Sequence, residues 1–266
     1  MIAGAHSNSG KSTITMGILL ELKRMGMDPQ SFKAGPDFLD PMHHTMVLNK
    51  SCRNLDTWMF PGGVRDAFVK GAKDSGISVI EGVMGLYDGM DGKNEEGSSA
   101  HLSKLLKTPV ILVIDAHGMS RSAGAIAAGF VGYDRDVNIA GVIFNNVGSE
   151  THLNMLRDSL RGIPCFGGVM RSDVMHLESR HLGLVPAAET YDPERYERIR
   201  EHVVSCVDIK AVIEAAKAAE PLESDTACES YARERVRIGV ARDQAFNFYY
   251  IHNIEALEAA GAEIVP

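Results

Sequence analysis

The residues with the clearest chemical capacity lie near the start of the chain, where residues 4–13 read GAHSNSGKST. Alanine, four residues and then Gly-Lys-Ser form the pattern of a phosphate-binding loop, and an amphipathic helical pattern follows it. In such a loop the backbone turns at Gly10, Lys11 reaches the phosphates and the Ser12 hydroxyl ligates Mg²⁺. We therefore predict a site for ATP, formed by Ser7, Asn8, Ser9, Gly10, Lys11, Ser12 and Thr13.

Carboxylates that could complete a magnesium shell come later in the chain. Glu81 directly follows the apolar run ISVI, and Asp88 lies in the glycine-rich loop after it. Lys33 and Asp37 flank the turn Gly35-Pro36 in SFKAGPDFLDP. A lysine can stabilise a transferring phosphoryl group, and an aspartate or glutamate can bind the metal. We therefore predict Lys11, Lys33, Asp37, Glu81 and Asp88 as catalytic residues.

Two further segments are expected to be structural. His43 and His44 are adjacent, so their side chains point to different sides, and we expect solvated histidines here and no metal site. Trp58, the one tryptophan, stands beside Met59 and Phe60, and we favour packing over ligand stacking for this apolar group.

The elements that must position these residues follow from the apolar pattern. Short runs rich in Val and Ile occupy residues 76–83, 109–116, 139–147 and 164–169, as in strands of a parallel sheet covered on both faces. Helical patterns lie at 12–25, 98–107, 120–131 and 152–161. The alternation predicts an α/β fold with a doubly wound, mostly parallel sheet of the P-loop NTPase type.

Composition excludes several classes of protein. The 266 residues carry a formal net charge of −8, so a basic surface for nucleic acid is not expected. No apolar run is long enough for a membrane span and the first residues lack the pattern of a secretion signal, so we expect neither membrane insertion nor secretion. The four cysteines are widely spaced and contain no CxxC pair, so we expect reduced thiols and a cytoplasmic location.

The domain organisation changes near residue 220. We expect residues 1–220 to form the nucleotide-binding domain and residues 221–235, which are rich in alanine and charge, to form a linker. Residues 236–266 begin a second α/β unit with a strand, a helix and another strand. The short run before the phosphate loop and the brief second unit suggest a fragment of a longer protein.

Together and in this order, the motifs resemble those of the cobyrinic acid a,c-diamide synthase family, including its cobyrinate, hydrogenobyrinate and nickel-sirohydrochlorin members. They read KAGPDFLDPMHH, NLDTWM, EGVMGLYDG, DAHGMSRSAGA, GVIFNNVGSETH and RHLGLVPAAE here, and the nucleotide-binding domain is also similar to dethiobiotin synthetase. The resemblance implies phosphorylation of a tetrapyrrole carboxylate by ATP, followed by attack of ammonia on the acyl phosphate, as in cobalamin biosynthesis. The alternative is the nickel-sirohydrochlorin reaction of coenzyme F430 synthesis.

The resemblance also implies roles for individual residues. Ser12, Asp37 and Glu81 would hold Mg²⁺, and Asn145 would contact the adenine of ATP. Asp88 would handle the substrate or the intermediate. The tetrapyrrole polycarboxylate would be bordered by Phe38, Leu39, Asp40, Arg53 and Asp88.

Two departures from related patterns limit these expectations. Residues 236–266 resemble only the opening of the family's class I glutaminase domain and contain no cysteine, so we expect ammonia as the nitrogen source of this chain. His6 stands where regulatory and partition-type P-loop ATPases carry a signature lysine, so that non-enzyme alternative is disfavoured. A homodimer remains open, but not one that shares ATP through that lysine.

Overall fold

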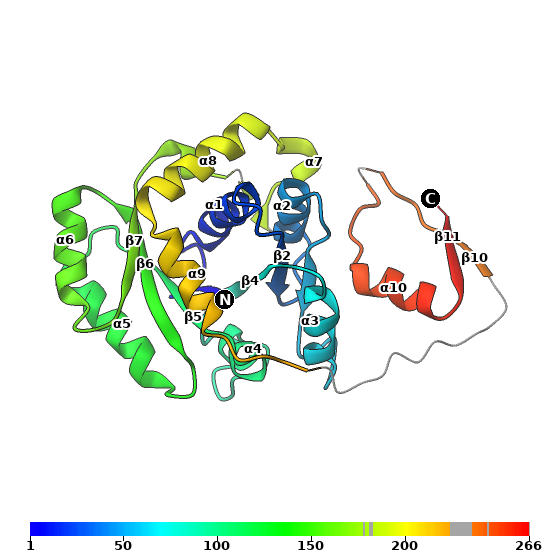
Figure 1. The fold of residues 1–266 in the computed structure, drawn as a ribbon, viewed down its shortest axis with the longest axis horizontal. Helices are drawn as coiled ribbons and strands as arrows, with labels where there is room; N and C mark the ends of the chain where they lie inside the picture. The colour runs from blue at the N-terminus through cyan, green and yellow to red at the C-terminus, as the bar shows by residue number, and fades with distance from the viewer. Residues whose placement is uncertain (178, 181–182, 224–235, 244, 266) are drawn as a thin grey trace.

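A seven-stranded parallel sheet forms the centre of the protein in this computed structural model, which describes residues 1–266 except 178, 181–182, 224–235, 244 and 266 (Figure 1). The strand order is β3-β2-β4-β1-β5-β6-β7, and each neighbouring pair runs parallel. The strands are β1 (Ile2–Gly4), β2 (Pro29–Ala34), β3 (Arg53–Leu55), β4 (Ile77–Gly85), β5 (Val110–Asp115), β6 (Ile139–Val147) and β7 (Cys165–Met170).

Helices cover both faces of this sheet, because alternate strand residues enter two separate cores. Ile80 and Leu112 lie in one core, and Val79 and Ile111 lie in the other. The first core is closed by α3 (Val64–Ala72), α4 (Ser99–Leu105), α5 (Arg121–Tyr133) and α6 (Glu150–Ser159). The second is closed by α1 (Lys11–Arg24), α2 (Leu39–Leu48), α8 (Pro193–Cys206) and α9 (Ile209–Lys217).

The predicted fold class is therefore confirmed, and the four predicted strands correspond to β4, β5, β6 and β7. The four predicted helices correspond to α1, α4, α5 and α6. The strand β2 carries no apolar run, since Pro29, Gln30, Ser31 and Lys33 interrupt it, yet all its residues are buried. Its position between β3 and β4 is set by hydrogen bonding to those strands, and the sequence of the segment alone does not predict this pairing.

Short elements complete the sheet domain. Between β7 and α8 lie η1 (Asp173–Met175), the antiparallel pair β8 (Ser179–Arg180) and β9 (Gly183–Leu184), and α7 (Ala187–Thr190). Among the described residues, no helix is both long and apolar enough to cross a membrane.

Beyond the sheet domain, a second unit comprises β10 (Val236–Gly239), α10 (Ile251–Ala259) and β11 (Ala262–Val265). The two strands form their own parallel sheet, separate from the seven-stranded one. We call residues 236–265 the C-terminal unit; in Figure 1 it lies beyond α3 and α2. Most of the predicted linker, residues 221–235, lies outside the described residues.

Close packing of α1 on α8 yields a prediction about Gly17. A Cβ at Gly17 would lie 2.6 Å from Cγ2 of Val203, whereas Gly129 in α5 has open space around it. We expect Gly17→Ala to lower the free energy of unfolding by about 1–3 kcal/mol through overpacking. Gly129→Ala should instead raise it by about 0.5–1 kcal/mol, because alanine favours the helix. Urea unfolding of both variants checks this, and equal effects would contradict the packing described.

Candidate active site

The phosphate loop follows β1 and ends at Gly10, the residue that caps α1. Gly10 has φ of 94°, and a Cβ there would lie 2.0 Å from Nδ2 of Asn145. That same Nδ2 donates to the backbone carbonyl of Ser9 at 3.0 Å. Glycine is thus required twice, by its backbone angle and by the close approach of Asn145 at the end of β6. Asn145 braces the loop, and contact with adenine stays a prediction.

The first two side chains of α1 point toward the ends of neighbouring strands. Lys11 donates from Nζ to the carbonyl of Met84 at 2.7 Å, and burial followed by the charge of Lys33 lowers the pKa of Lys11. Ser12 donates from Oγ to Glu81 at 2.7 Å, and its Oγ also lies 3.3 Å from Oδ2 of Asp40. The loop that should hold phosphate therefore adjoins two carboxylates.

Lys33 lies at the centre of this group. The parallel register of β2 and β4 sets Lys33 opposite Glu81, and Nζ lies 2.8 Å from Oε1 of Glu81. Nζ also bonds to Oδ2 of Asp40 and lies 3.6 Å from Oδ2 of Asp37. Only 3% of Lys33 is exposed, so its positive charge is held in the interior by three carboxylates.

Electrostatics in this group run in opposite directions for the two nearest carboxyls. Burial opposes ionisation of Glu81, but Lys33 and His44 outweigh it and hold the pKa of Glu81 well below its ordinary value. Burial and then the charge of Glu81 raise the pKa of Asp40. For Lys33, burial favours loss of the proton, but Glu81, Asp40 and Asp37 raise its pKa above the ordinary value. Lys33 therefore stays an ammonium ion.

The expectation of solvated histidines is wrong. His43 and His44 are both buried, at 2% and 0% exposure. Nε2 of His44 lies 2.8 Å from Oε2 of Glu81, while Nε2 of His43 donates to the carbonyl of Val185 at 2.8 Å and its Nδ1 contacts the hydroxyl of Tyr196. The signal for His44 was available, because Asp40 and His44 are four residues apart on α2 and so share the face that meets Glu81.

We call residues 36–40, which run from the end of the Gly35-Pro36 turn into the first two residues of α2, the 36–40 loop. The phosphate loop and the 36–40 loop line one cavity of about 660 Å³. It opens at the carboxyl ends of β1, β2 and β4, where the chain passes from one side of β1 to the other, which is the usual ligand position in such sheets. Its walls are formed by Ser7, Asn8, Gly10, Lys11, Ser12, Thr13, Lys33, Pro36, Asp37, Leu39, Asp40, Val83, Met84, Met175, His176 and Leu177.

The remaining predicted site residues lie around this cavity or further from it. Asp37 lines it, and its Oδ1 accepts the backbone N–H of Leu39 at 2.8 Å. Asp88 is exposed, caps the turn after β4 by accepting the N–H of Gly85 at 2.8 Å, and its charge is felt by Lys11. Arg53 instead pairs with Glu255 of the C-terminal unit.

Sequence reasoning missed Met84, whose carbonyl receives Lys11, and misjudged Trp58. Met84 has φ of 47°, an unusual angle that turns its carbonyl toward the lysine. Trp58 is 66% exposed, so the expectation that it packs is wrong, whereas its neighbour Phe60 does pack against the core.

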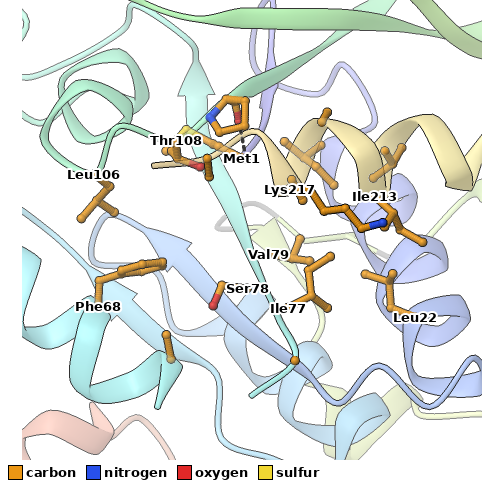
Figure 2. Close-up of a pocket in the computed structure, with 18 of the residues that line it drawn as sticks. Met1, Leu22, Phe68, Ile77, Ser78, Val79, Leu106, Thr108, Ile213 and Lys217 are labelled. Carbon is orange, nitrogen blue, oxygen red and sulfur yellow. Dashed lines mark hydrogen bonds between the residues drawn. The ribbon is translucent and has the colours of Figure 1, made fainter. Parts of the chain in front are cut away.

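A larger cavity, of about 810 Å³, lies at the other end of the strands and has a different character. Figure 2 shows side chains of β4, α1 and α9, including Ile77, Leu22 and Ile213, arranged around it. Its lining is mainly aliphatic, and it contains none of the residues of the phosphate loop. Of the residues predicted from the sequence to act in the site, Lys11, Lys33 and Asp37 line the smaller cavity.

Comparison with known proteins agrees with the sequence motifs. A family model described as the CobQ/CobB/MinD/ParA nucleotide binding domain matches residues 1–185. The cobyrinate a,c-diamide synthase of Picrophilus torridus is 41% identical over 270 residues, and that of Priestia megaterium is 40% identical over 270 residues. Both alignments cover 100% of this chain but 61% and 59% of the relatives, so the chain spans about three fifths of their length. The predicted resemblance is thereby confirmed.

Among solved structures, the septum site-determining protein MinD from Pyrococcus horikoshii OT3, complexed with Mg-ADP, is similar with 17% identity and a TM-score of 0.49. That match covers 81% of this chain and 95% of MinD. The cell division protein FtsY from Thermotoga maritima has 17% identity and a TM-score of 0.46, covering 75% of this chain and 67% of FtsY. At these values the likenesses carry no argument about the site.

The charge group around Lys33 yields a stability prediction. Lys33→Met removes the cation between Glu81 and Asp40 and should lower the free energy of unfolding by about 3–5 kcal/mol, because buried carboxylates lose their partner. The control is Lys217→Met, which removes an exposed ion pair with Glu214 and should cost about 1 kcal/mol or less. Denaturant unfolding at neutral pH measures both, and a Lys33→Met value equal to the control would contradict the electrostatics described.

Proposed function

The chain belongs to the CobQ/CobB/MinD/ParA nucleotide-binding domain family, and from this premise we propose that it uses ATP to activate carboxylates of a tetrapyrrole for amidation. The acceptor we propose is cobyrinic acid, amidated at its a and c side chains. The names of relatives about 40% identical along the whole chain support this choice.

The observation that carries the proposal is the shared cavity. Lys11 and Ser12, which begin α1 directly after the phosphate loop, line the same 660 Å³ space as Asp37, Leu39 and Asp40. A phosphate donor on one wall and a carboxylate acceptor on the other would meet beside Lys33. Holding two reactants in such proximity is a main source of rate enhancement.

The donor set of this cavity fits Mg²⁺. The Ser12 hydroxyl and the carboxylates of Glu81 and Asp40 are hard oxygen ligands within contact of one another. Asp37, the ligand predicted from the sequence, lines the same cavity, and Oδ2 of Asp40 lies 3.3 Å from the Ser12 hydroxyl. When bound, Mg²⁺ would neutralise charge on the phosphates.

The protein's own residues would perform the remaining tasks. Lys33, kept charged by its neighbours, would donate hydrogen bonds to the acceptor carboxylate and hold it near the nucleotide. A carboxylate oxygen would attack the γ-phosphorus, ADP would leave, and an acyl phosphate would remain. Ammonia would then attack the acyl carbon, release inorganic phosphate and lose a proton to give the amide. Lys11 would turn from the Met84 carbonyl toward the phosphates.

The proposal predicts a specific loss on removing Lys11. With Mg-ATP, ammonium chloride and cobyrinic acid, Lys11→Ala should lower the rate of amide formation by about 100-fold or more, because one preorganised cation is lost. Lys23→Ala is the matched control, since it lies on the same helix about 18 Å further along. Mass spectrometry counts the amides added. Parental activity in Lys11→Ala would contradict the proposal.

The same assay separates the possible acceptors and nitrogen donors. Cobyrinic acid, hydrogenobyrinic acid and nickel-sirohydrochlorin are offered in parallel, and we expect cobyrinic acid to be amidated fastest. We expect ammonium to support the reaction and glutamine to fail, because residues 236–266 hold no cysteine nucleophile. Equal turnover with glutamine would refute the expected nitrogen source, and preference for another acceptor would reassign the substrate.

A further inference from the structure

The C-terminal unit contacts the 36–40 loop through aromatic rings. Phe38 stacks with Phe248, with centroids 5.1 Å apart and planes at 6°, and with Tyr250 at 4.2 Å and 22°. The Tyr250 hydroxyl donates to the carbonyl of Pro36 at 2.7 Å. Stacked aromatic rings add to the stability that their burial provides, and the hydrogen bond of the Tyr250 hydroxyl fixes the orientation of its ring. A residue predicted to border the substrate is therefore held by a different unit of the chain.

A second set of contacts reaches the base of the same loop. Nε2 of His252 donates to the carbonyl of Asn54 at 3.1 Å. The Asn54 side chain in turn donates to the carbonyls of Gly35 at 2.9 Å and Asp37 at 2.7 Å. Asn54 is buried and lies in β3, so α10 touches the strand residue that fixes both ends of the turn.

An ion pair anchors this contact. Glu255 on α10 accepts two hydrogen bonds from Arg53, at 3.0 and 2.5 Å, and lies 3.2 Å from Nζ of Lys70. The geometry is bidentate, and only 16% of the Arg53 side chain and 21% of the Glu255 side chain are exposed. Partly buried pairs with this geometry are stronger than ordinary surface pairs.

We propose that the C-terminal unit is a clamp that sets the position of the 36–40 loop, with Tyr250 and Glu255 as positioning residues for the acceptor carboxylate. The proposal rests on the proposed function in so far as the 36–40 loop borders the acceptor. Docking engages Phe38 and Pro36 directly, and their neighbours Asp37, Leu39 and Asp40 line the cavity proposed to hold the acceptor. By thermodynamic linkage, the factor by which docking of the C-terminal unit changes the affinity for the acceptor equals the factor by which the bound acceptor changes the docking equilibrium.

Four variants, one of them a control, test the clamp. Glu255→Arg sets like charges against Arg53 and Lys70, and the pair Arg53→Glu with Glu255→Arg restores attraction. Glu258→Gln, on an exposed position of the same helix, is the matched control. The first readout needs no ligand: amide hydrogen exchange of residues 37–40 and 42, the non-proline positions of residues 36–42, should speed up by about fivefold or more in Glu255→Arg, and the double variant should recover at least half of the difference.

The second readout is binding. Titration followed by the absorbance of cobyrinic acid should give a Kd raised by about fivefold or more in Glu255→Arg, while the Kd for Mg-ATP changes less than twofold. The milder Glu255→Gln should move both readouts in the same direction by a smaller amount. Unchanged amide exchange of residues 37–40 and 42 in both Glu255→Arg and Glu255→Gln would overturn the clamp. If the parental protein does not bind cobyrinic acid, the proposed function fails, while the exchange result still decides the clamp.

Discussion

A buried ammonium group is the constraint on which the site depends. Lys33 can stay charged inside the protein only because Glu81 and Asp40 surround it, and the buried Glu81 stays ionised because Lys33 lies beside it. The register of β2 on β4 is what brings Lys33 and Glu81 face to face. Charge compensation, strand pairing and the shape of the cavity thus depend on the same residues. A change in the pairing of β2 with β4 would separate Lys33 from Glu81 and alter the cavity.

This arrangement explains why side chains from two helices, α1 and α2, make hydrogen bonds to Glu81. Ser12 comes from the first turn of α1 and His44 from the middle of α2, and each gives Glu81 one hydrogen bond. With Lys33, these bonds satisfy both oxygens of a fully buried carboxylate. In the proposed reaction the metal and the acceptor would compete for these contacts. Because Glu81 already has its hydrogen-bond partners in the free protein, binding of the metal and the acceptor would require only a local exchange of these partners.

Much of the fold could be predicted from the sequence because its signals are local. Continuous apolar runs indicated β4 to β7, and the glycine-lysine-serine pattern indicated the loop before α1. The unpredicted strand β2 has polar residues, and its place depends on pairing across the sheet. In the site, Glu81 and Lys33 were identified from strand ends and turn residues. His43 was misjudged because its burial against Tyr196 of α8 and the carbonyl of Val185 cannot be read from two adjacent histidines. Trp58 was misjudged because apolar neighbours in the sequence do not guarantee that a side chain is covered in the fold.

Transfer of oxygen from the acceptor to phosphate tests the central claim most directly, namely that a carboxylate is phosphorylated beside Lys33. Cobyrinic acid with ¹⁸O in its carboxylates would be incubated with Mg-ATP and ammonium, and the released inorganic phosphate would be analysed by mass. The account predicts one ¹⁸O atom in each phosphate, in proportion to the amides formed. Amide formation with unlabelled phosphate would contradict it.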